Sequence, residues 1–164
     1  MNMNKYKTEI KWALIQSGMF LAWMSVERMV GLHSTELANQ QLVTTFILVP
    51  SFVIYILALR SKRKNVYDNK ITYKQSFVSG LWLTIFIVLL SPVNQIVTTT
   101  IISPDYFSNL TAYTISNGIM TQEQAQAQFN NGSYIIQSVV GGFITGMIFS
   151  TIISFFIKSK PVKS

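Results

Sequence analysis

The stretch Tyr134–Ile157, YIIQSVVGGFITGMIFSTIISFFI, decides the fold of this chain. It holds no charged residue, and Lys158 follows it directly. A helix needs about 20 largely apolar residues to cross the roughly 30 Å of hydrocarbon in a bilayer. The stretch therefore predicts a membrane-spanning helix.

Three further apolar stretches precede it, at about residues 12–30, 41–59 and 77–102. Only 12% of the 164 residues are charged, whereas globular domains carry about 25%. We expect an all-α membrane protein of four transmembrane helices. A single membrane domain, 12–157, then lies between an N-terminal segment, 1–11, and a basic tail, 158–164.

The positions of the basic residues predict the orientation, because the cytoplasmic ends of membrane helices collect Lys and Arg. Two connections, 32–40 and 103–133, contain neither residue type. The basic residues lie instead before the first span, between the second and third, and after the last: Lys5, Lys7, Lys11; Arg60, Lys62, Arg63, Lys64, Lys70, Lys74; Lys158, Lys160, Lys163. We therefore expect both termini in the cytoplasm.

The net charge of +7 borders apolar stretches instead of covering one folded face, so we expect contact with anionic lipid headgroups and no nucleic-acid partner. The chain has no cysteine and one histidine, which excludes disulfides and Cys-based metal sites. No HExxH, GxSxG or P-loop motif is present. We expect no enzymatic activity, no metal and no cofactor.

The long connection between the third and fourth spans predicts short interfacial helices. Ser103–Asp105 has the pattern of a helix start, with Ser103 as the capping residue. Asn117–Gly118 predicts a turn. Thr121 and Gln124 match the capping box of a second short helix, which Asn131–Gly132 would end.

Small residues recur every four positions along the fourth span and form a groove that another helix can enter. They are Ser138, Gly142, Gly146, Ser150 and Ser154. The groove serves either packing within the chain or association with a second copy or another membrane protein.

Pro92 interrupts the third span and frees a carbonyl near Val88. We expect Asn94 and Gln95 to satisfy the groups exposed by the resulting kink. The kink is either architectural or a binding point of the kind that broken helices form in transporters.

Polar residues in the outer half of the spans predict a polar crevice that opens outward: Glu27, Arg28, Asn94, Gln95 and Gln137, with His33 and Glu36 at its rim. Charges within membrane segments indicate function by default, although Arg28 lies shallow enough to snorkel. The pair Glu27 and Arg28 is either an anchor or structural ion-pair element, or part of a ligand or proton site. Acid–base chemistry would require Glu27, His33 or Glu36 to converge.

The two faces of the first span differ. Gly18, Ala22 and Ser25 share one face, and Gln16 and Glu27 lie roughly opposite. Either this helix is sandwiched between neighbours, or one face meets a second protein.

The chain resembles the family of domain-of-unknown-function proteins numbered 4199. The resemblance rests on Glu27-Arg-Met-Val-Gly-Leu32, Tyr73-Lys-Gln-Ser-Phe-Val-Ser-Gly80, Pro92 with Gln95, Ser103-Pro-Asp-Tyr-Phe107, and Met120-Thr-Gln-Glu-Gln-Ala125 before Phe129. It implies a four-helix protein of the bacterial inner membrane, and it implies no activity. We expect a non-catalytic structural or partner-associating protein, with a small transporter or ligand sensor as the alternative.

Overall fold

A computed structural model describes residues 6–159 of the chain; the expected basic positions Lys5, Lys160 and Lys163 lie outside this range. The described part is helical, with short connections. Its elements are α1 (Lys7–Met29), α2 (Leu37–Thr45), α3 (Leu48–Val66), α4 (Tyr73–Val97), a π-helical segment (Thr98–Ile102), α5 (Tyr106–Ser116), α6 (Gln122–Gln128) and α7 (Asn131–Ile157).

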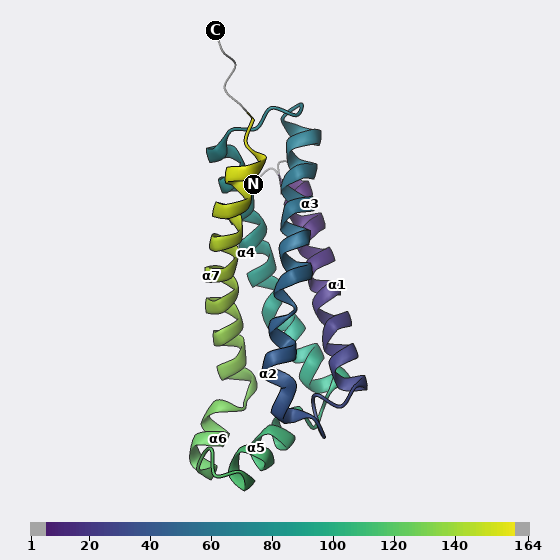
Figure 1. The fold of residues 1–164 in the computed structure, drawn as a ribbon, viewed down its shortest axis with the longest axis vertical. Coiled ribbons are helices and arrows are strands. Elements are labelled where there is room, and N and C mark those ends of the chain that lie inside the picture. Colours follow the sequence, from purple (N-terminus) through teal and green to yellow (C-terminus); the bar gives the residue numbers. More distant parts are fainter. Residues whose placement is uncertain (1–5, 160–164) are drawn as a thin grey trace.

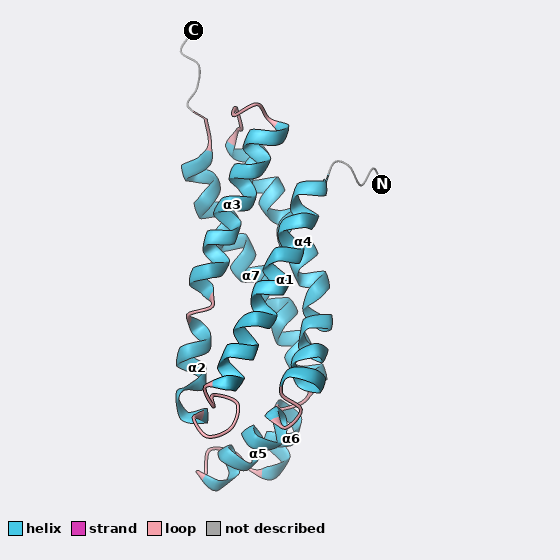
Figure 2. Cartoon of the chain, turned by 90° about the vertical axis from the view of Figure 1, so that its right-hand side faces the viewer, coloured by secondary structure: helices cyan, strands magenta, loops and turns pink. Residues whose placement is uncertain are grey.

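Four long helices, α1, α3, α4 and α7, run side by side along the molecule, and α4 packs against each of the other three (Figure 1). At one end, α2 extends the line of α3, and α5 and α6 lie beneath the bundle (Figures 1 and 2). We call this the loop end. The opposite end holds the start of α1, the end of α7 and the basic segment 60–74, which runs from the last turns of α3 into α4, and we call it the basic end.

Three helical stretches of the described chain are long and apolar enough to cross a membrane: Leu37–Val66, Tyr73–Ile102 and Asn131–Ile157. The expectation of four such helices is therefore met only in part. The first long helix, α1, is not among these three, and its 23 residues include the charged Lys7, Glu9, Lys11, Glu27 and Arg28.

Polar side chains lie inside the bundle, and large apolar side chains cover much of its outside. Glu9, Gln16, Glu27, Ser76 and Thr84 are buried. Exposed apolar side chains include Leu42, Phe46, Val49, Ile101, Val140, Ile148 and Phe156. This distribution suits a lipid surround, because lipid contributes no hydrophobic drive and interhelical polar contacts hold the helices together.

The small-residue groove of α7 is filled by α4 of the same chain. Ser154 Oγ donates to Ser76 Oγ at 2.8 Å, and Ser138 Oγ to Ser91 Oγ at 3.4 Å. Between them, a Cβ added at Gly146 would meet Thr84 and the Tyr55 hydroxyl. Of the two alternatives, this groove therefore serves packing within the chain, and α4 covers the surface that a second copy would have to contact.

The carbonyl that Pro92 releases has a partner inside its own helix. Ser91 Oγ donates to the Val88 carbonyl at 2.8 Å, and α4 continues through the proline. The expectation that Asn94 and Gln95 satisfy this region is wrong, because the hydroxyl one residue before the proline is nearer. The helix widens later, where Thr98–Ile102 adopts π geometry.

The second apolar stretch is two helices, not one. Pro50 lies in the first turn of α3, where it cannot donate to the Phe46 carbonyl, and the chain turns at Phe46–Ile47. The resulting short helix α2 is a wall of the site described below.

The short helices of the long connection are confirmed, with two corrections. The capping box of Thr121 and Gln124 is present on α6, and the turn at Asn117–Gly118 ends α5 with a Gly118 φ of 65°. However, Asp105, not Ser103, precedes α5 as its N-cap residue. Asn131–Gly132 does not end α6 but begins α7, since the preceding Asn130 caps that helix through the Ser133 N–H.

Candidate binding site at the loop end

The end of α1 turns the chain back onto its own last turn. Gly31 has a φ of 84°, and the N–H groups of Gly31 and Leu32 donate to the carbonyls of Arg28 and Glu27 at 3.1 and 2.9 Å. This is the Schellman motif, which calls for a residue that tolerates the left-handed conformation. The turn returns the next side chain, His33, towards Glu27.

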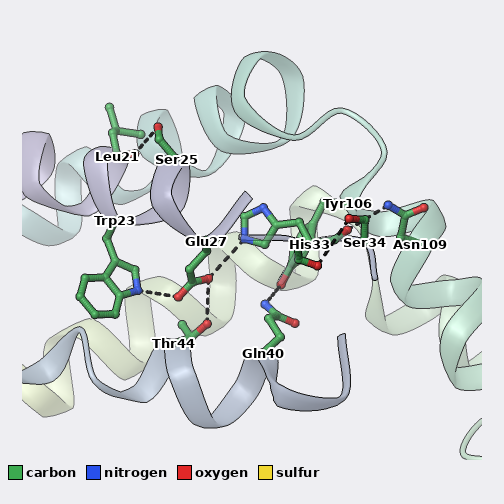
Figure 3. Close-up of polar contacts among 11 residues, drawn as sticks. Leu21, Trp23, Ser25, Glu27, His33, Ser34, Gln40, Thr44, Tyr106 and Asn109 are labelled. Atoms are coloured by element: carbon green, nitrogen blue, oxygen red, sulfur yellow. Dashed lines mark hydrogen bonds and ion pairs between the residues drawn. The ribbon is translucent and has the colours of Figure 1, made fainter. Parts of the chain in front are cut away.

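The Glu27 carboxylate is enclosed by three polar side chains (Figure 3). Trp23 Nε1 donates to Oε1 at 2.5 Å, Thr44 Oγ1 donates to Oε2 at 2.9 Å, and His33 Nε2 lies 3.3 Å from Oε2. The Glu27 residue is 1% exposed. Both oxygens of this buried group therefore have hydrogen-bond partners, without which its burial would be costly.

His33 joins α1 to α5. Its ring lies 4.7 Å from the ring of Tyr106, and its carbonyl accepts from Asn109 Nδ2 at 2.9 Å. Gln40 Nε2 donates to the Tyr106 hydroxyl at 2.5 Å (Figure 3). The expected position of His33 on a solvated rim is wrong, because the residue is 2% exposed. Glu36 does lie at the surface, where Asn39 donates to it at 3.2 Å.

Burial also sets the protonation of the aromatic wall. It raises the pKa of Tyr106 above the ordinary value of 10.0, and this outweighs the opposing effect of the Gln40 hydrogen bond. The ordinary value already keeps the Tyr106 hydroxyl protonated at neutral pH, and burial extends this to higher pH.

Beside this cluster lies a cleft of about 740 Å³ between α2 on one side and α5, α6 and the start of α7 on the other. Two residues of the cluster around Glu27 and His33, Thr44 and Tyr106, belong to its lining, as does Gln40. The remaining lining residues are Leu37, Ala38, Gln41, Thr45, Ile47, Leu48, Leu110, Tyr113, Thr114, Ile119, Met120, Gln128, Phe129, Tyr134 and Gln137.

The five residues expected to form one crevice lie in separate places. Glu27 is at the cluster just described, and Gln137 lines the cleft. Arg28 is exposed, and its guanidinium donates to the Ile102 carbonyl. Asn94 accepts from Ser17 Oγ at 2.6 Å.

Asn94 therefore lies about 15 Å from Glu27 along the bundle, towards the basic end, since Ser17 and Glu27 are ten residues apart on α1. Gln95 is buried beside it on α4, and its Nε2 has no hydrogen-bond partner among residues 6–159.

A second buried ionisable cluster lies at the basic end and was not predicted from the sequence. Lys62 Nζ lies 2.9 Å from Glu9 Oε1, and Ser79 Oγ donates to the same oxygen at 2.6 Å. Lys62 thus points into the bundle instead of towards headgroups. Helical periodicity could have found the acidic partner, because Glu9, Gln16 and Glu27 recur on one face of α1 at 100° per residue.

That face of α1 packs inward, and no other part of the described chain covers the opposite face. Gln16 Nε2 donates to Ser51 Oγ at 2.9 Å, which places the face against α3. Gly18 and Ala22 are exposed, and a Cβ at Gly18 would meet nothing within 4 Å among the described residues. Within one chain α1 is therefore not sandwiched.

The fold and the apolar helices define an all-helical protein with the character of a membrane protein. The model of the family described as "Protein of unknown function (DUF4199)" matches residues 11–159, and the chain belongs to this family. No curated protein and no solved structure matches it.

Proposed function

We propose that this chain is an integral protein of the bacterial plasma membrane that crosses it four times, through α1 as well as the three apolar helical stretches. The basic end lies in the cytoplasm. It binds a small ligand in the outward-facing cleft at the loop end and catalyses no reaction on it.

The polar face of α1 packs inside the bundle, and this supports the proposal that α1 also crosses the membrane. Trp12–Val26 is uncharged, and the buried Gln16 and Glu27 make their hydrogen bonds with other helices. Such a helix can cross lipid although its composition is less apolar than that of its neighbours, because its polar groups face protein. The distribution of Lys and Arg supports the orientation.

The absence of native cysteine makes this topology directly testable. Ser116→Cys at the loop end and Asn65→Cys at the basic end are both exposed positions. A membrane-impermeant maleimide should label Ser116→Cys in intact cells, and Asn65→Cys only after permeabilisation. Labelling of Asn65→Cys in intact cells would contradict the topology.

The cleft is the single observation that carries the ligand-binding role. Its volume lies in the range of about 300–1,000 Å³ typical of small-molecule sites, and a few polar groups project from a mainly apolar lining. The alternative of partner association through the α7 groove has less support, because α4 already fills that groove.

The arrangement of Glu27 and His33 supports a non-catalytic role. The two side chains converge at 3.3 Å, yet neither is among the residues that line the cleft in the described chain. Both carboxylate oxygens are already engaged by donors. The pair is thus placed to hold the wall of the cleft in position.

Ligand binding is tested by protection from labelling. Thr45→Cys lies in the cleft and Ser116→Cys does not. A metabolite and lipid extract of the native cells should slow the reaction of N-ethylmaleimide with Thr45→Cys and leave Ser116→Cys unaffected. Equal rates for both variants with and without extract would remove the proposal.

A further inference from the structure

The chemistry of the cleft lining indicates what class of ligand it takes, and this inference rests on the proposed ligand-binding function. No Asp, Glu, Lys, Arg or His is among the lining residues of the described chain. A charged ligand would lose its hydration without gaining a counter-charge, which is strongly unfavourable. The nearest buried carboxylate, that of Glu27, is already satisfied by Trp23, Thr44 and His33.

The polar groups that do line the cleft can both donate and accept. Gln41, Gln128 and Gln137 line it with exposed side chains, which make no hydrogen bond to other described residues and are open to a ligand. Each amide offers two donor hydrogens and an acceptor oxygen. Gln41 lies on α2, whereas Gln128 and Gln137 lie on the facing elements, so a bound molecule would meet amides on two sides.

Aromatic rings supply the remaining wall. Tyr106, Tyr113, Phe129 and Tyr134 line the cleft, and the Tyr134 ring lies 6.1 Å from Tyr106 and 6.4 Å from Phe129. Such rings bury large apolar areas, and the tyrosines carry a polar edge. A ligand that matches this wall has an apolar face bounded by polar groups.

We propose that the cleft binds an uncharged, polyhydroxylated ring, that is, a sugar, either free or as the headgroup of a glycolipid. The C–H face of a sugar ring packs on the aromatic wall, and its hydroxyl groups exchange hydrogen bonds with the amides of Gln41, Gln128 and Gln137. An acyl chain would use the aromatic wall but leave the amides without partners. Because the wall continues into the apolar helix α7, the ring can arrive from water or from the membrane.

The test uses Thr45→Cys protein in phosphatidylcholine nanodiscs and measures the rate of its reaction with N-ethylmaleimide. The free-sugar arm adds glucose or N-acetylglucosamine, and the lipid arm incorporates monoglucosyl diacylglycerol. Phosphate, glutamate, choline and diacylglycerol serve as probes of other chemistry. A ligand at ten times its Kd should slow the labelling roughly tenfold by mass action.

We expect protection in at least one of the two sugar arms, and which arm responds identifies the source. Gln137→Leu in the same background should relieve the protection, whereas Ile136→Leu, on the same helix but outside the lining, should not. Retained protection in Ile136→Leu shows that a conservative change on this turn does not by itself relieve it.

Protection by phosphate, glutamate, choline or diacylglycerol without protection by either sugar probe would overturn the sugar inference and leave ligand binding standing. The same holds if only the cell extract protects and Gln137→Leu does not relieve it. If neither the probes nor the extract protect Thr45→Cys, the proposed function falls as well.

Discussion

His33 Nε2 lies 3.3 Å from Glu27 Oε2, and both side chains are almost fully buried at the junction of α1, α2 and α5. The contact depends on the left-handed turn at Gly31, which reverses the chain between the two residues. It links the last turn of the first helix to the elements that enclose the cleft. Variants at Glu27 and at Gly31 test its energetic weight.

Removal of the Glu27 carboxylate should destabilise the loop end. Glu27→Leu leaves the half-buried Trp23 Nε1 and Thr44 Oγ1 without an acceptor, and we expect a loss of about 1–3 kcal/mol in the free energy of unfolding. Glu27→Gln, which keeps an acceptor oxygen, should cost less. Denaturant titration in detergent micelles gives both values, and equal stability of Glu27→Leu and wild type would contradict the role assigned to the carboxylate.

Gly31→Ala should destabilise the protein more than Gly118→Ala. Both glycines have positive φ, which costs an alanine roughly 1–2 kcal/mol. At Gly31 the new Cβ would also approach Thr35 Oγ1 to 2.5 Å, whereas at Gly118 it meets nothing within 4 Å. The double variant Gly31→Ala, Thr35→Ala should recover part of the difference in a thermal unfolding measurement. No recovery would show that strain alone accounts for the loss.

A large side chain on α7 should destabilise the protein at Gly146, where α7 packs on α4, but not at the nearby Gly141. A Cβ at Gly146 meets Thr84 and Tyr55, while one at Gly141 meets nothing within 4 Å. We therefore expect Gly146→Ile to lose at least the roughly 1–3 kcal/mol of an overpacked core, and Gly141→Ile to remain near wild type. Similar stabilities for the two variants would contradict the packing of α7 on α4.

The ion pair at the basic end should show strong coupling. Removal of one partner, as in Glu9→Gln or Lys62→Met, leaves an uncompensated buried group and should cost about 3–5 kcal/mol. The double variant should be less destabilised than the sum of the single variants. A double-mutant cycle on the free energy of unfolding measures this term, and strict additivity would mean that the pair contributes nothing.

Local sequence patterns predicted the features that depend on neighbouring residues. The capping box at Thr121 and Gln124, the turn at Asn117–Gly118 and the small-residue row on α7 each depend on spacings of one to four residues. Such patterns operate within one helix or turn, so no tertiary information is needed to recognise them.

The features that sequence reasoning missed depend on contacts between distant segments. Glu9 and Lys62 are 53 residues apart, and no local pattern pairs them. His33 was expected at a solvated rim because its burial depends on the packing of Tyr106 and Asn109 from α5. The cleft requires α2 to lie opposite α5, α6 and the start of α7, an arrangement that only the packed structure supplies.

The most direct measurement is a native mass spectrum of the protein released from membranes of its own cells. The account predicts a bound, uncharged small molecule or glycolipid on the wild-type chain. It predicts loss of this adduct in Gln137→Trp, which fills the cleft, and its retention in Ile136→Trp, one residue away and outside the lining. An adduct that is equally abundant in all three proteins, or absent from the wild type, would contradict the account.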